Sequence, residues 1–222
     1  MTTSSGTGEA GARRVGGAGA RSVAARDDGR VTLAKIRGHF LTITRHKLLV
    51  MRHCFAVGLY RQGLAHDLSK YSLVEFRTGA RYFQGDRSPN AAEREARGYS
   101  EAWLHHKGRN RHHFEYWVDM RGNGDATLEG KPMPTRYVVE MFCDRVAACK
   151  VYKGAAYTDR SALEYFQFER SHGFLRLMHP DTAALLERLL RMLAQDGERE
   201  TFRAIREQIV RPRSAYGDGI RF

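Results

Sequence analysis

The stretch that decides the fold is residues 135–152, TRYVVEMFCDRVAACKVY. Its apolar side chains recur at the spacing of one helix face, on Tyr137, Val138, Met141, Phe142, Val146 and Val151. This periodicity predicts a helix with one buried side. Asp144 falls within the same stretch at an inward-facing position, one turn after Glu140. An aspartate is costly to bury unless it is paired or coordinates a cation, so Asp144 is a candidate metal ligand. Glu140 could equally be a salt-bridge partner of Arg136 or Arg145.

Towards the N-terminus, a second apolar pattern runs from Val31 to about Gly58 and predicts a long first helix. His39, His46 and His53 lie seven residues apart, so they project from roughly one face of it. A short helix follows and carries residues 64–70, LAHDLSK. Ser72, with Glu75 three residues later, is a capping-box pattern that begins the next helix.

Towards the C-terminus, the sequence predicts further helices and no extended sheet. Ser100 is the expected N-cap of a short helix, and Asn110 the expected cap of another that reaches Trp117. Residues 121–134 are rich in glycine and proline and predict a loop or a small hairpin. Two amphipathic helices at about 181–194 and 198–209 complete an all-α class. We therefore expect a compact helical bundle over 31–212, a disordered tail over 1–30 and a C-terminal tail over 213–222.

Composition limits the functions to consider. The chain has 222 residues, a length for one domain, and a formal net charge of +12 that favours phosphate-bearing partners, including nucleic acid. Its three cysteines, Cys54, Cys143 and Cys149, show no paired spacing, which argues against a zinc ribbon or a disulfide framework. No apolar run is long enough for a membrane span and no signal peptide is evident, so we expect a cytoplasmic protein without a membrane partner.

Histidines concentrate in the first half of the chain. Of the ten, seven lie between residues 46 and 113, several beside another potential ligand. Divalent metals need nitrogen and oxygen ligands that converge from different elements, and this region supplies them. Within a helix, successive side chains point about 100° apart, so one member of each doublet can lie outside the first coordination shell. The candidate metal ligands are His46, His66, Asp67, His105, His106, His112, His113 and Asp144. We expect His39 and His53 to be surface or core-edge residues instead.

The order of these residues resembles the HD-domain superfamily of helical, metal-dependent phosphohydrolases. His66-Asp-Leu-Ser-Lys70 is similar to the HDxxK core of that superfamily, and His46 to its first-helix histidine. Asp144 is similar to its last aspartate. More narrowly, GLYRQGLAHDLSKYS and HHKGRNRHHFEYW resemble an uncharacterised family that carries only a domain-of-unknown-function label. That likeness covers most of residues 40–170 and implies no activity.

The HD resemblance implies a ligand set and a class of reaction. His46, His66, Asp67 and Asp144 match the ligands of mononuclear members, and Asp67 could bridge two metals. The histidines at 105, 106, 112 and 113 fill the interval in which two-metal members add ligands. The GYP motif of the cyclic-dinucleotide phosphodiesterases is absent and the histidine doublets lie much closer together than in that branch, so that substrate does not carry over.

We therefore expect a metal-dependent phosphohydrolase that acts on a small phosphorylated molecule such as a nucleotide. One or two divalent ions, Mn, Fe or Mg, would activate water. Lys70, Lys107 and Arg109, with neighbouring Arg111, would bind phosphate. Glu115 would orient an imidazole or serve as a general base. Two alternatives stay open: a di-iron oxygenase of the same superfamily, and a non-enzymatic nucleic-acid-binding protein with structural histidines.

Overall fold

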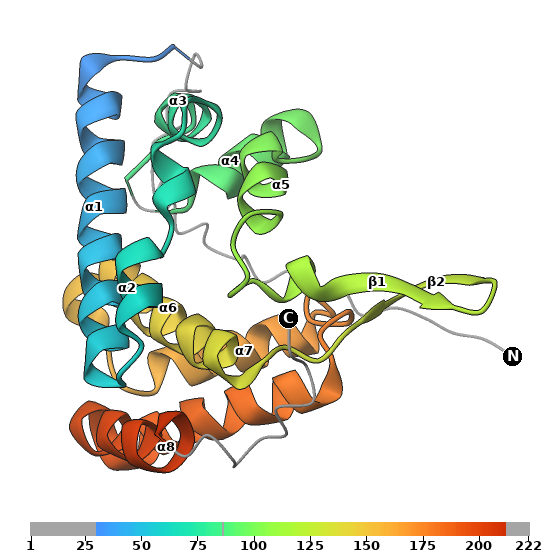
Figure 1. Cartoon of the computed structure of the whole chain (residues 1–222). Helices are drawn as coiled ribbons and strands as arrows, with labels where there is room; N and C mark the ends of the chain where they lie inside the picture. Colours follow the sequence, from blue (N-terminus) through green and yellow to red (C-terminus); the bar gives the residue numbers. More distant parts are fainter. Residues whose placement is uncertain (1–29, 86, 212–222) are drawn as a thin grey trace, which may run out of the picture.

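The computed structural model describes residues 30–85 and 87–211, and these residues form a helical protein with one small hairpin. The all-α class expected from the sequence is confirmed. The elements (Figure 1) are α1 (Leu33–Ala56), α2 (Tyr60–Ala65), η1 (Leu68–Tyr71), α3 (Leu73–Arg81), α4 (Pro89–Arg97), α5 (Glu101–Lys107), η2 (Phe114–Trp117), β1 (Val118–Gly122), β2 (Asp125–Gly130), α6 (Thr135–Lys153), η3 (Gly154–Ala156), α7 (Ser161–Ser171), α8 (Pro180–Ala204) and η4 (Ile205–Val210).

Helix α6 is the centre of the hydrophobic core. Its Val139, Phe142 and Val146 are fully buried, and it packs against α1, α7 and α8 (Figure 1). α8 supplies a buried leucine row, of which Leu189 and Leu193 are completely excluded from solvent. Burial of such side chains contributes roughly 1.5–3 kcal/mol each. The stretch that predicted the class of the fold therefore forms the element around which the other helices assemble.

The last helical segment bends sharply at Gly197. Residues 180–204 form one element, but Gly197 has φ 77° and ψ 172°, a backbone conformation that interrupts the helix and that L side chains rarely adopt. The two helices expected at 181–194 and 198–209 correspond to the arms on either side of this break. A short segment with π-helical hydrogen bonds, η4, extends the second arm.

Two regions between α3 and α6 differ from the sequence expectation. The helix expected from Asn110 to Trp117 is absent; the described residues there form a loop and the short 3₁₀ segment η2. Conversely, helix α4 was not expected, although Pro89 at its first turn is a typical start signal. The segment 121–134 contains most of an antiparallel hairpin, in which Asn123 and Gly124 both have positive φ, as its two-residue turn requires.

The expected tails, residues 1–30 and 213–222, lie outside the described residues except for Arg30. Within 30–85 and 87–211, no helix has both the length and the apolar character needed to cross a membrane.

Candidate metal centre

Helix α1 positions one ligand at the middle of its buried face. His39, His46 and His53 are all buried, as their seven-residue spacing predicted for a common face. Only His46 reaches the other candidate ligands. The His39 ring packs near Phe76 and Phe83, and the Nδ1–H of His53 donates to the carbonyl of Cys143 at 3.2 Å. Both flanking histidines therefore belong to the core rather than to the surface, and neither faces the centre.

A tight turn after α2 places His66 and Asp67 beneath α1. Gly63 permits the close approach of the two helices, because a Cβ there would lie 2.9 Å from Cys54 Cβ. Lys47 on α1 donates to the carbonyls of Leu64 and His66, at 2.8 Å each, and so holds the end of α2. Asp67 itself adopts a left-handed conformation, φ 54° and ψ 24°, which is strained for a residue other than glycine. Such strain is typical of functional sites.

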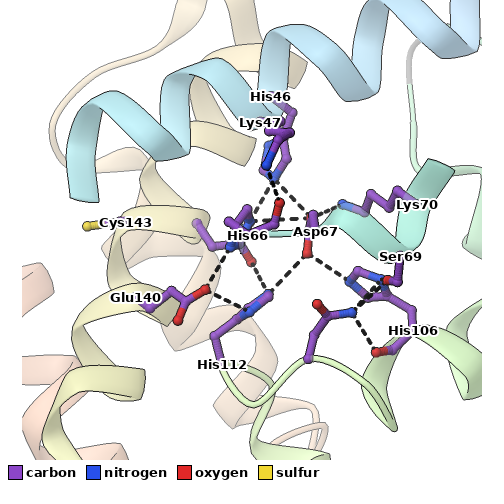
Figure 2. A network of polar contacts seen from close by, with 12 residues as sticks. His46, Lys47, His66, Asp67, Ser69, Lys70, His106, His112, Glu140 and Cys143 are labelled. Carbon is purple, nitrogen blue, oxygen red and sulfur yellow. Dashed lines mark hydrogen bonds and ion pairs between the residues drawn. The ribbon is translucent and has the colours of Figure 1, made fainter. Parts of the chain in front are cut away.

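Helix α6 supplies two acidic side chains one turn apart. Asp144 faces His46, with Oδ1 2.9 Å from His46 Nε2. Glu140 is buried, and its Oε1 accepts hydrogen bonds from the Nδ1–H groups of His66 and His112, at 3.0 and 3.3 Å (Figure 2). Glu140 is therefore not the salt-bridge partner of Arg136 or Arg145 that the sequence also allowed. It orients two imidazoles so that their Nε2 atoms point to the centre.

Helix α5 and the loop after it bring in the remaining histidines. Asn110 does not cap a helix; its amide donates to the carbonyl of His106 at 2.8 Å and to Ser69 Oγ at 2.8 Å, which folds the loop back on α5. His112 and His113 lie in this loop and not in a helix, so the angle of about 100° between neighbouring helical side chains does not apply to them. Both can therefore face the centre. His106 is held by Glu75 on α3, whose Oε2 lies 2.8 Å from its Nδ1.

His105 does not contribute to the centre. It lies one residue before His106 on α5, and its Nδ1–H donates to the other oxygen of Glu75, at 2.6 Å. The ring thus points away from the ligands, as expected for one member of a helical doublet. His105 is one of the candidate ligands expected from the sequence, but it lies outside every donor group formed by the described residues.

Two groups of ligand atoms meet at Asp67. Within each group the atoms lie within 4.8 Å of one another, about twice the length of a metal–ligand bond, so one ion can contact all of them. The first donor set consists of His46, His66, Asp67 and Asp144, and the second donor set consists of Asp67, His106, His112 and His113.

Each oxygen of Asp67 faces one of the two sets. Oδ2 lies 3.3 Å from His66 Nε2 and 3.7 Å from His46 Nε2. Oδ1 lies 3.3 Å from His106 Nε2 and 3.4 Å from His112 Nε2 (Figure 2). A single carboxylate is thus arranged to join two adjacent cation positions.

Several ligand atoms of the two donor sets lack hydrogen-bond partners among the described residues, which supports a metal site rather than a purely structural hydrogen-bond network. Four buried ligand atoms have no hydrogen-bond partner among the described residues: Nε2 of His66, His112 and His113, and Oδ1 of Asp67. Two further ligand atoms, His46 Nε2 and Asp67 Oδ2, are contacted by Asp144 Oδ1 at 2.9 Å and by Lys70 Nζ at 2.5 Å. Buried polar atoms without partners are rare in proteins, because each costs roughly 1–3 kcal/mol. All four unpartnered atoms belong to the two donor sets, so bound metal would satisfy them together.

The charges around Asp67 also favour a cation. Burial raises the pKa of Asp67, but His66, Lys70 and His106 outweigh burial and hold the pKa well below its usual value. Burial lowers the pKa of His66, but Asp67 and the neighbouring carboxylates outweigh it and raise the pKa well above its usual value. Burial keeps the pKa values of His46 and His113 low, so these imidazoles are neutral and able to bind metal. The carboxylates thus stay ionised and draw positive charge.

A cavity of about 560 Å³ opens onto the centre. His46, His106, His113 and Asp144 line its floor, and Lys70 and Glu115 line its wall. Lys70 Nζ lies 2.5 Å from Asp67 Oδ2. Burial raises the pKa of Glu115. The carboxylates that orient imidazoles are Glu75 and Glu140, not Glu115.

The expected phosphate-binding residues are only partly found at the cavity. The described residues that line it do not include Lys107 or Arg109, and Arg111 contacts Tyr116 and Tyr137 instead. The cationic residues on the lining, besides Lys70, are Arg87, Arg145 and Lys153. No motif in the sequence identifies these three residues as neighbours, because Arg87 comes from the segment before α4 and the other two from α6.

The comparison with protein families gives one match. Residues 35–192 match the model of a family of unknown function (DUF5662), and the chain belongs to that family. The matched range contains every residue of both donor sets. No curated protein and no solved structure matches the chain.

Proposed function

We propose that this member of the DUF5662 family is a metal-dependent phosphohydrolase that acts on a small phosphorylated molecule such as a nucleotide. The observation that carries the proposal is the position of Asp67, whose two oxygens face two separate sets of buried ligands. The order His46, His66-Asp67, Asp144 also resembles the HD-domain superfamily, whose members include phosphohydrolases of this kind.

The ligand types narrow the choice of ion. The two sets combine imidazoles with carboxylates, and such mixed sets suit Mn²⁺ or Fe²⁺ better than Mg²⁺, which prefers oxygen ligands. When bound, such an ion lowers the pKa of a coordinated water and polarises a phosphoryl oxygen. The depressed pKa of Asp67 and the neutral state of His46 favour binding of the ion near neutral pH, whereas His66, whose pKa is raised, must release a proton as the ion binds.

The cavity wall supports phosphate as the reacting group. Lys70 lies on the lining next to Asp67, so its ammonium can contact a phosphoryl oxygen held at the floor. Lys153, at the C-terminal end of α6, lines the same cavity. Glu115 lies within the cavity, and its raised pKa suits a group that transfers a proton near neutral pH.

The experiment is phosphate release from a panel of nucleotides and sugar phosphates by protein loaded with Mn²⁺ or Fe²⁺. We expect turnover of at least one compound, and loss of both turnover and metal in Asp67→Asn. Asp181→Asn is the matched control, since this aspartate lies exposed on α8. Metal binding without turnover on the whole panel would count against the phosphohydrolase.

A di-iron oxygenase is the second candidate, and the number of ligands favours it. The two sets together offer five histidines and two aspartates, enough for two irons. Metal analysis and optical spectra distinguish the candidates. Two irons per chain, with an absorption band in the oxidised state and oxygen consumption, would favour the oxygenase; activity with Mn²⁺ alone would exclude it.

A further inference from the structure

The cavity continues past the metal centre along α6 towards α7. From Asp144 the lining follows the half-buried side of α6 through Arg145, Ala148 and Cys149. Tyr165 and Glu169 of α7 face this part, and Phe114 and Glu115 close it from the other side. A cavity of about 560 Å³ is of the size that takes a small organic ligand, and much more than one phosphate fills.

Arg145 lines this part of the cavity and carries a hydrogen-bond donor that no described residue uses. Its Nη1 lies 2.5 Å from Glu169 Oε2, so the charge of the guanidinium is paired. Its Nε is buried and has no hydrogen-bond partner among the described residues. A buried donor left unpaired costs roughly 1–3 kcal/mol, so its retention next to a cavity points to a partner that arrives with the substrate.

The charges here differ from those beside Lys70. Two carboxylates, Glu115 and Glu169, lie here with two cations, Arg145 and Lys153, and burial raises the pKa of Glu115. Arg145 is paired with Glu169 and Lys153 with Glu164, so no uncompensated positive charge attracts a second phosphate or a carboxylate group. The walls between the polar groups are apolar, formed by Phe114, Ala148 and Cys149. An uncharged ring with hydrogen-bond donors for the carboxylates and an acceptor for Arg145 fits both features.

We propose that Arg145, Glu169 and Glu115 form a specificity subsite that binds the nucleobase of a nucleoside monophosphate whose phosphate lies at the metal centre. This inference deepens the proposed function and rests on it for the phosphate only. The base packs against Phe114, accepts a hydrogen bond from Arg145 Nε and donates to the carboxylates. Sugar phosphates without a base lack these contacts.

The test is calorimetric binding of guanosine, adenosine, cytidine and uridine, of their 5′-monophosphates, and of ribose 5-phosphate to the Mn²⁺-loaded protein. Arg145→Lys retains the positive charge beside Glu169 and removes the Nε donor. Glu169→Gln changes the acceptor. Arg170→Lys and Glu187→Gln are the matched controls, because this pair joins α7 to α8 away from the cavity.

We expect at least one nucleoside monophosphate to bind about 10-fold or more tightly than ribose 5-phosphate, which corresponds to about 1.4 kcal/mol. Arg145→Lys and Glu169→Gln should lose that preference and keep the affinity for ribose 5-phosphate, while the controls keep both. Equal affinity for ribose 5-phosphate and every nucleotide, or a preference unchanged in both cavity variants, would overturn the subsite.

Failure of the subsite and failure of the proposed function give different results. If a free nucleoside binds and loses affinity in Arg145→Lys, but no nucleotide is hydrolysed, the subsite stands and the phosphohydrolase does not. If nucleotides and ribose 5-phosphate are hydrolysed with the same KM, the phosphohydrolase stands and the subsite does not. Thermal unfolding of each variant identifies any that is misfolded, and the remaining variant then decides.

Discussion

The two donor sets share Asp67 but are built on different parts of the molecule. The first set takes His46 from α1 and Asp144 from α6, the two long helices that pack against each other in the core. The second set takes His106 from the seven-residue α5, and His112 and His113 from the loop after it. The first set contains two carboxylates; the second contains only the shared Asp67.

This difference predicts an order of metal binding. The first set has more negative charge to offset that of a divalent ion, and long packed helices hold its ligands in place before the ion arrives. The ligands of the second set depend on the contacts of Asn110 and Glu75 with His106. We therefore expect the first set to bind metal more tightly and to fill first, and the second set to complete the centre.

The largest effect should come from removing what the two sets share. Asp67→Asn deletes the charge that faces both sets, and the amide cannot bridge two ions as a carboxylate does. We expect loss of both metals and a fall of phosphate release to background, measured by metal analysis and by turnover. One tightly bound metal per chain in this variant would show that Asp67 is not shared.

The next effect should separate the two sets. Asp144→Asn removes a ligand of the first set only, and His106→Gln removes a ligand of the second only. We expect His106→Gln to retain about one tightly bound metal per chain, and Asp144→Asn to lose the tight site and bind metal weakly. Titration with Mn²⁺, followed by calorimetry, measures both. Equal losses of affinity in the two variants would contradict the expected order.

A smaller effect on metal binding should follow from substituting the carboxylates that contact the Nδ1 atoms of the ligand imidazoles. Glu140 contacts His66 of the first set and His112 of the second, whereas Glu75 contacts His106 of the second alone. Loss of such a partner typically weakens metal binding about 10- to 100-fold. Glu140→Gln should therefore weaken both sites and Glu75→Gln only the weaker one. Glu164→Gln, an exposed change on α7, should alter neither titration.

The same contrast explains how far the sequence could predict the centre. Periodicity identified the two long helices and assigned Asp144 to a buried face. His46 was identified by its resemblance to the first-helix histidine of the HD-domain superfamily, and the burial of His39 and His53 on the same face was not expected. His105 and His106 could not be distinguished in this way, because the choice depends on where α3 carries Glu75. That position follows from tertiary packing, which spacing along α5 does not encode.

Local signals failed where side chains serve a distant contact. Asn110 has the residue type of an N-cap, yet its amide ties the loop to His106 and Ser69, and the expected helix does not form. From the sequence, Glu140 could be either a partner of the metal centre or a salt-bridge partner of an arginine. Its contacts with His66 and His112, which come from distant segments, decide between these interpretations. The metal-ligand candidates other than His105 were therefore predictable, whereas their supporting contacts and the cationic residues of the cavity, apart from Lys70, were not.

The smallest effect on metal binding, and a distinct effect on stability, should come from His53. It shares a face of α1 with His46 but faces neither donor set; burial, with Lys150 nearby, lowers its pKa to about 4. The unfolded chain takes up this proton near pH 6.5, while the folded protein resists it down to about pH 4. Unfolding therefore binds a proton in this window, and stability falls as pH falls through it.

His53→Gln should remove this slope while keeping a donor for the Cys143 carbonyl. The metal-free protein should lose at most about 3 kcal/mol between pH 6.5 and 4 because of His53, and the variant correspondingly less. Urea unfolding at several pH values in the presence of a chelator measures this, with the exposed His172→Gln as control. An unchanged slope in His53→Gln would show that other groups of the metal-free protein, and not His53, cause the acid sensitivity.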